Sequence, residues 1–177
     1  RNNKHADIVI PEKEETLHDF LISQIPLQNL NDQQKIIAEF LIGCIDNNGF
    51  LKSEIFAISE DLFFNHNLTV SEEEIIHVLK IVHEFDPAGV GAKDLQECLL
   101  LQLNRKKQTY EIKLAKNILI SSYDLFKTKN FKKIKLKLNI DDNDLKKSFN
   151  EISKLNPKPG GNFTLPGDST NYIIPDF

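Results

Sequence analysis

The stretch "FDPAGVGAKDLQECLLLQL", residues 85–103, places one proline and two glycines between two segments with helical hydrophobic spacing. Proline fixes its φ angle and has no backbone N–H, so the helix before Pro87 must end there. Gly89 and Gly91 can adopt positive φ angles, and Val90 between them can insert one apolar side chain into a core. The chain must therefore turn sharply at this corner before a further helix begins.

The signature of the corner comprises the residues that make the turn and those that begin the next helix. They are Phe85, Asp86, Pro87, Gly89, Val90, Gly91, Asp94, Leu95 and Leu99. The "GVG" triplet does not indicate a phosphate loop. The dinucleotide fingerprint needs a preceding strand and a third glycine, and the P-loop needs Gly-Lys followed by Ser or Thr. The corner therefore favours an architectural role.

Before the corner, hydrophobic residues recur at intervals of three and four, which is typical of amphipathic helices. Capping residues at Thr16, Asn31, Ser53 and Ser71 predict four helix starts. The "DNNG" turn at residues 46–49 predicts the end of the second helix. A fifth helix is expected over residues 95–103, docked against the first four.

After a polar break at "NRKKQT", residues 104–109, the pattern predicts three further helices. One is long and carries its apolar residues from Ile112 to Phe126, one is short and basic over residues 131–138, and one is capped by Asp141. The last two have the lengths and the turn of a helix-turn-helix. The tail, residues 157–177, is rich in proline and glycine, so we expect an extended strap with one strand at residues 172–174.

No segment shows the period-two alternation of a half-buried strand, so the predicted fold class is all-α. We expect a helical bundle at residues 15–105, a smaller three-helix, helix-turn-helix-like unit at residues 106–156, and the strap at residues 157–177.

Charge divides unevenly along the chain. Residues 1–100 contain seven Lys and Arg against 18 Asp and Glu, and residues 101–177 contain fifteen against eight, which gives −11 and +7. The basic part can face a polyanion or an acidic protein, or it can be a solvated lysine-rich surface. Arg105 is the only arginine among those fifteen cations, which argues against bidentate reading of guanine.

The residue pattern favours neither an enzyme nor a metal or cofactor site. His77 and His83 are six residues apart, so on one helix they point in different directions and cannot share a metal as an i, i+4 pair can. Cys44 and Cys98 lie among apolar residues, which predicts reduced core thiols. With no apolar run long enough for a membrane span and no signal peptide, we expect a cytoplasmic protein. The chain contains no Met, so we expect it to be part of a longer one.

The corner stretch resembles the signature of the core-binding region of the sigma-54 family of bacterial transcription initiation factors. Three other stretches agree in order and spacing: "LHDFLISQIPL" from Leu17, "IAEFLIGCIDNNGFL" from Ile37 and "ISKLNPKPGGNF" from Ile152. The resemblance implies a non-catalytic domain that binds the β and β′ subunits of core RNA polymerase. Promoter DNA and the AAA+ activator would be partners of the full-length protein. Residues 1–14 would be the remnant of an acidic linker.

The resemblance leaves the contact residues open. Candidate contacts with polymerase or DNA are the cations Lys93, Arg105, Lys132, Lys133, Lys135, Lys137 and Lys158. We expect Gly91→Val to loosen the domain before it harms any contact.

An alternative function is DNA binding through a helix-turn-helix at residues 130–154, whose lysines would give salt-dependent and poorly specific binding. Asp141, Asp142 and Asp144 at the start of its second helix would repel phosphate and favour a protein partner. A third possibility is a regulatory domain that binds only the activator.

Overall fold

The structure is a computed structural model that describes residues 15–161 and residue 163. Within these residues it contains nine α-helices and one 3-10 helix, and its only β pairing is two isolated bridges, which confirms the all-α class. The elements are α1 (Leu17–Gln24), η1 (Ile25–Leu27), α2 (Asp32–Gly43), α3 (Ile55–His66), α4 (Glu72–Val82), α5 (Leu95–Asn104), α6 (Tyr110–Ser121), α7 (Tyr123–Lys127), α8 (Phe131–Leu138) and α9 (Asp142–Ser153). No helix among the described residues is long and apolar enough to cross a membrane.

Side-chain caps set most of the helix starts. The predicted caps Thr16 and Asn31 each form a capping box, and the hydroxyl of Ser71 accepts a hydrogen bond from the Glu74 amide. The third helix differs from the prediction by one residue. Its N-cap is Glu54 rather than Ser53, and it has no side-chain cap hydrogen bond.

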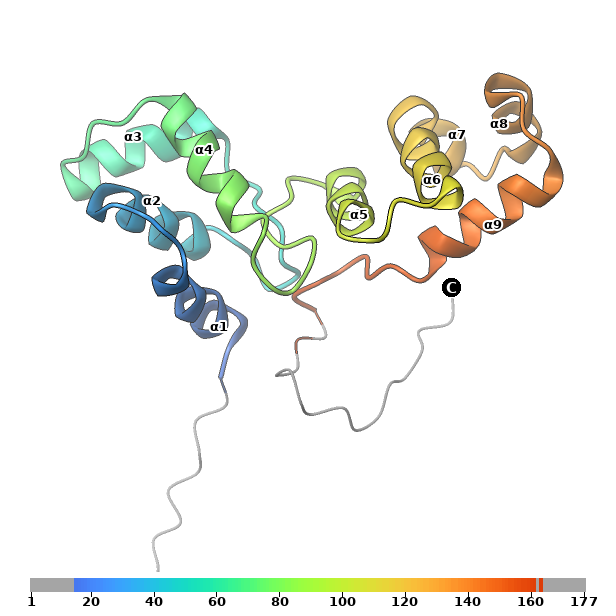
Figure 1. The fold of residues 1–177 in the computed structure, drawn as a ribbon. Helices are drawn as coiled ribbons and strands as arrows, with labels where there is room; N and C mark the ends of the chain where they lie inside the picture. Colours follow the sequence, from blue (N-terminus) through green and yellow to red (C-terminus); the bar gives the residue numbers. More distant parts are fainter. Residues whose placement is uncertain (1–14, 162, 164–177) are drawn as a thin grey trace, which may run out of the picture.

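Helices α1–α4 form the first group around one hydrophobic core (Figure 1). Its apolar stripes come from the periodic positions that the sequence shows, and the corner adds Phe85 and Val90 to the same core. The expected insertion of Val90 is confirmed, since its side chain is fully buried. Fully buried residues of this core include Leu21, Ile37, Leu41, Ile58, Leu62, Ile75, Val78 and Val82.

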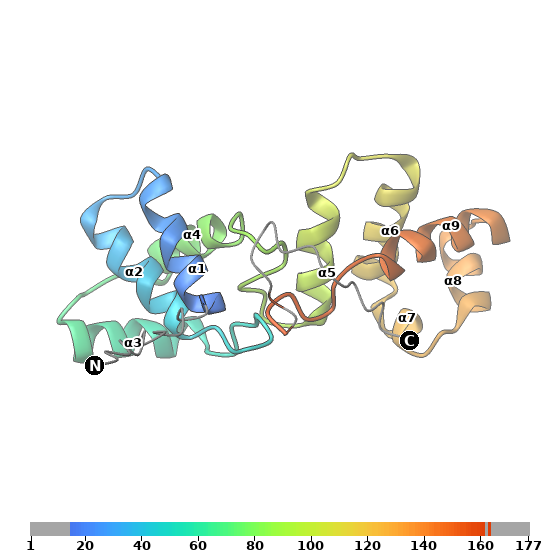
Figure 2. The same ribbon diagram turned by 90° about the horizontal axis from the view of Figure 1, so that it is seen from below.

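Helices α5–α9 form the second group. Leu99 and Leu103 of α5 share a core with the inward face of α6 and with Ile152 and Leu155 at the end of α9. Figure 2 shows α5 between the first group and α6. Helix α5 was expected to dock against the first four helices. Its Leu99 and Leu103 instead pack with α6 and the end of α9, whereas Cys98 packs against Phe50 and Ala92 in the two loops beside the first group.

The long helix expected from Ile112 to Phe126 is two helices. Ser122 leaves helical geometry, with φ −137° and ψ 29°, and separates α6 from α7. The change of direction lets Phe126 stack on Tyr123 and lie 5.4 Å, between ring centroids, from Phe149 of α9. Aromatic packing across helices accompanies this break, and residues 110–153 contain four helices instead of the expected three.

The chain after α9 returns to the first group, as the orange segment in Figure 1 shows. The amide of Gly160 donates to the carbonyl of Asn48, 2.9 Å away, in the loop after α2. The described part of the predicted strap thus crosses from one helical group to the other. The predicted acidic linker at residues 1–14 and the predicted strand at residues 172–174 lie outside the described residues.

Candidate functional site

Three loops meet between the two helical groups, and we call them together the central junction. They are the corner at residues 85–92, the "DNNGFL" loop at residues 46–51, and residues 156–160, where the strap begins. All three segments are short. Hydrogen bonds between backbone groups, and a few bonds from side-chain amides to backbone, hold the junction together.

The corner needs both of its glycines. Gly89 has φ +92° and Gly91 has φ +82°, in the left-handed region that residues with a Cβ rarely adopt. A Cβ on Gly89 would also lie only 2.8 Å from the Sγ atom of Cys98, whereas one on Gly91 would lie 3.2 Å from the ring of His83. The corner is therefore confined by helix α5 on one side and by the end of α4 on the other.

The corner pairs with the "DNNGFL" loop as a short stretch of parallel backbone. The Gly91 amide donates to the Gly49 carbonyl at 2.8 Å, and the Leu51 amide donates to the Ala92 carbonyl at 2.9 Å. On the other side of the corner, the Nε2 atom of His83 lies 3.0 Å from the Gly91 carbonyl. These contacts join the ends of α2 and α4 through the corner.

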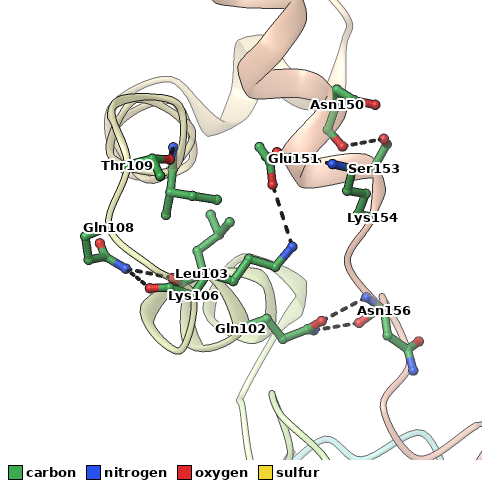
Figure 3. A network of polar contacts seen from close by, with 11 residues as sticks. Gln102, Leu103, Lys106, Gln108, Thr109, Asn150, Glu151, Ser153, Lys154 and Asn156 are labelled. Carbon is green, nitrogen blue, oxygen red and sulfur yellow. Dashed lines mark hydrogen bonds and ion pairs between the residues drawn. The ribbon is translucent and has the colours of Figure 1, made fainter.

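Two glutamine side chains bind backbone in the manner of a paired strand. The Gln24 side chain on α1 donates to the Asp86 carbonyl at 2.7 Å and accepts from the Asp86 amide at 2.8 Å. Gln102 on α5 makes the same pair of bonds with Asn156, at 2.7 and 2.8 Å (Figure 3). Gln102 is buried, so its amide must be satisfied in this way.

Arg105 fastens the end of α5 to the corner. Its guanidinium donates to the Asp86 carboxylate at 2.8 Å, to the His83 carbonyl at 3.0 Å and to the Phe85 carbonyl. Only 27% of its side chain is exposed. The structure thus gives this predicted contact residue three intramolecular acceptors.

A second polar network joins the turn after α5 to α9 (Figure 3). The Nζ atom of Lys106 lies 3.7 Å from the Oε2 atom of Glu151. The Oε1 atom of the same carboxylate lies 3.2 Å from the Nζ atom of Lys154. The Gln108 side chain donates to the carbonyls of Leu103 and Lys106. This network joins the end of α5 and the turn after it to α9.

The structure distributes the predicted lysine contacts over three places. Lys132 and Lys133 on α8 are exposed, and within the described residues their side chains have no hydrogen bond or ion pair. Lys135 pairs with Asp142 of α9, and Lys137 donates to the Ser121 carbonyl. The remaining two are exposed elsewhere: Lys93 at the corner and Lys158 on the strap. Their contacts with a partner stay a prediction.

The cysteines and the potential metal ligands were the remaining candidates for chemistry. No group of three or more His, Cys, Asp or Glu residues in the described part of the chain is placed to hold a metal ion. Burial raises the pKa of the Cys98 thiol to about 11, and burial likewise raises the pKa of Cys44. Both thiols are free, as predicted, and are protonated at neutral pH.

Sequence reasoning missed the residues that tie the junction together, namely Gln24, Gln102, Asn156 and Gly160. Gln102 lies on the apolar face of its helix, which was a signal that its amide has a buried partner. Nothing local to Gln24 indicates its partner, which lies 62 residues away.

Comparison with known proteins gives a consistent result. Residues 9–177 match the family profile described as sigma-54 factor, core binding domain. The chain is 34% identical over 166 residues to the RNA polymerase sigma-54 factor of Vibrio anguillarum, covering 93% of the chain and 33% of that protein. It is 31% identical over 166 residues to the sigma-54 factor of Escherichia coli, covering 93% and 34%. It is 32% identical over 175 residues to the sigma-54 factor of Bacillus subtilis, covering 99% of the chain and 38% of that protein. The chain thus spans about a third of the length of these relatives.

Proposed function

Because the chain belongs to the sigma-54 factor family, as its core-binding domain, we propose that it binds core RNA polymerase through the β and β′ subunits. The match over residues 9–177 carries this proposal, since it includes both helical groups and the junction between them. The domain acts as a non-catalytic adaptor in the cytoplasm. Promoter DNA and an AAA+ activator are partners of the full-length factor.

The junction supports an adaptor role. A domain that bridges two subunits of a large partner must hold its own two parts in a fixed relation. Two loosely connected parts would lose conformational entropy on binding, which would weaken the affinity. Backbone pairing at Gly49 and Gly91, the two glutamine clamps and Arg105 provide such a connection. We propose that the corner serves architecture, and that the outer faces of the two groups make the contacts.

Direct DNA binding through α8 and α9 is less favoured. Asp141 caps α9, Asp142 pairs with Lys135, and the Asp144 carboxylate lies 3.2 Å from the Tyr110 hydroxyl. A recognition helix presents its N-terminal residues to the DNA, and here that end carries three carboxylates. They would repel phosphate and neutralise part of the lysine charge of α8.

The test is to titrate the chain against purified core RNA polymerase that lacks any sigma factor. A random DNA duplex is titrated in parallel over a range of salt concentrations. Saturable binding to polymerase, with weak DNA binding that disappears as salt rises, is the expected result. Tight DNA binding without affinity for polymerase would replace this proposal with the helix-turn-helix function.

A further inference from the structure

Helix α3 presents an aromatic face to solvent. Phe56, Phe63 and Phe64 have exposed fractions of 61%, 49% and 77%. The rings of Phe63 and Phe64 meet edge to face with centroids 5.2 Å apart. Exposed apolar groups of this size on a small domain mark interaction surfaces.

The geometry of α3 places a carboxylate within this face. Glu60 follows Phe56 by four residues and precedes Phe63 and Phe64 by three and four, so these side chains are neighbours on one helix surface. Within the described residues, Glu60 is exposed and has neither an ion pair nor a hydrogen bond from its side chain. We call Phe56, Glu60, Phe63 and Phe64 the α3 patch.

The fold itself does not use the α3 patch. Ile58 and Leu62, on the opposite side of α3, are fully buried in the core of the first group. Helix α3 packs on α2 and α4 through that side. It lies at the margin of the first group in both views (Figures 1 and 2).

The charge in the patch specifies the chemistry of a partner. A purely apolar partner would bury the Glu60 carboxylate without compensation, which is costly. A partner that carries Arg or Lys among apolar residues would pair with Glu60 and stack its cation on the phenyl rings. Residues 1–100 carry a formal charge of −11, which attracts the same kind of partner.

The same carboxylate disfavours two other occupants. A two-fold contact between copies of the chain through this face would bring the same acidic patches together. Nucleic acid would meet a negative surface at Glu60 and the neighbouring Asp61.

We propose that the α3 patch docks a segment of core RNA polymerase that bears Arg or Lys among apolar side chains. This rests on the proposed function and assigns one surface to it. Phenylalanine side chains supply the buried anchors, and Glu60 sets the orientation by pairing with the cation.

The first test compares equilibrium binding of the parent chain and of Phe56→Ser/Phe64→Ser to core polymerase lacking sigma, with a fluorophore on the chain's amino terminus. The matched control is Ile120→Ser, which removes an apolar side chain that is 65% exposed on α6. Thermal unfolding checks that all three chains fold alike. The phenylalanine variant should bind roughly tenfold more weakly or worse, and the control should bind like the parent.

The outcomes separate this proposal from the proposed function. If the parent binds polymerase and the phenylalanine variant binds equally well, the α3 patch is not the docking surface, although the domain still binds polymerase. If the parent does not bind at all, the proposed function is wrong, and the proposed partner of the α3 patch is wrong as well.

Charge variants test the chemistry of the partner. Glu60→Gln should weaken binding, and Glu60→Lys should weaken it further, because repulsion from the cation replaces attraction. Binding of Glu60→Lys at parental strength would exclude a basic partner. A dimer of the parent in sedimentation equilibrium that Phe64→Ser dissociates would show that a second copy occupies the patch, which would also overturn the proposal.

Discussion

Gly89 and Gly91 are required at the corner for different physical reasons, so substitutions at the two positions should lower the free energy of unfolding by different amounts. A Cβ on Gly89 would collide with Cys98 and would also lie 2.9 Å from the Gln102 amide nitrogen, whereas a Cβ on Gly91 would meet only the His83 ring at 3.2 Å and more distant atoms. We expect Gly89→Ala to lower the free energy of unfolding by about 2 kcal/mol or more, because φ strain and overpacking combine. Gly91→Ala should cost about 1 kcal/mol from φ strain alone, and the β-branched Gly91→Val should cost more.

Gly43, at the end of α2, is the matched control. A Cβ there would meet nothing within 4 Å, so Gly43→Ala should leave stability unchanged or raise it by up to about 1 kcal/mol. Urea unfolding followed by circular dichroism measures all four variants. Equal losses for Gly43→Ala and Gly89→Ala would contradict the assigned role of the corner.

Because the pKa of the Cys98 thiol is raised, we expect the folded chain to lose stability at alkaline pH. Its pKa is raised by burial from the ordinary 9.0 to about 11, so the folded chain holds this proton more tightly than the unfolded chain does. The contribution is fully present below about pH 9 and is lost as the pH rises toward about 11. The free energy of unfolding should therefore fall over this window, and Cys98→Ala should reduce that slope. The variant must be compared with itself across pH, because Cys98→Ala also removes packing. An unchanged slope would show that other groups, such as Tyr123, cause the loss.

At the scale of elements, the strap is held by close backbone approach to the "DNNGFL" loop. A Cβ on Gly160 would lie 2.7 Å from the Asn47 carbonyl oxygen and 2.8 Å from the Gly49 amide nitrogen. Because both neighbours are backbone, they cannot rotate away. We expect Gly160→Ala to detach the strap from the loop while the helices stay folded. Hydrogen exchange should rise in residues 156–161 and 46–51 and stay unchanged in α2 and α6.

The neighbouring glycine provides the control for the strap. A Cβ on Gly161 would meet Lys158 Cβ at 3.2 Å and the Asn48 side chain at 3.4 Å, which are wider separations than the 2.7 and 2.8 Å at Gly160. Gly161→Ala should therefore leave exchange close to that of the parent. Faster exchange throughout α9 in Gly160→Ala would instead mean that the strap supports the whole second group.

At the scale of the whole molecule, Arg105 couples the two helical groups. Removing its guanidinium leaves the His83 and Phe85 carbonyls and the Asp86 carboxylate without this donor. We expect Arg105→Ala to lower stability by about 1 to 3 kcal/mol and to make the groups unfold separately. The exposed Lys107, two residues on, gives the control variant Lys107→Ala.

The tyrosines make separate unfolding visible. Tyr110 and Tyr123 lie on α6 and α7, Tyr172 lies outside the described residues, and the chain has no Trp. In a Tyr172→Phe background, tyrosine fluorescence reports the second group, and far-ultraviolet circular dichroism reports all helices. The two signals should coincide during urea unfolding of the parent and diverge in Arg105→Ala. Coincident transitions in both proteins would show that Arg105 is not the coupling residue.

The α3 patch could have been predicted from the local sequence pattern, whereas the helix break at Ser122 could not. Phe56, Phe63 and Phe64 fall off the apolar stripe of Ile55, Ile58 and Leu62, so helical spacing alone could have marked them as outward-facing. Ser122 gives no such signal. Residues 112–126 have the spacing of one helix, and the break at Ser122 goes together with ring contacts to α9 that form only in the folded chain.

The sequence by itself determined the all-α class, most helix starts, the conformation demanded of the corner and the family, because capping, hydrophobic period and glycine or proline placement act within a few residues. Only the tertiary structure decided that α5 packs with α6 and α9, that Arg105 turns inward to three acceptors, and that Gln24 and Gln102 clamp distant backbone. These choices depend on which buried polar groups and apolar faces meet across 19 to 62 residues of chain. No local pattern encodes that pairing, because each partner is satisfied only when the other is already in place.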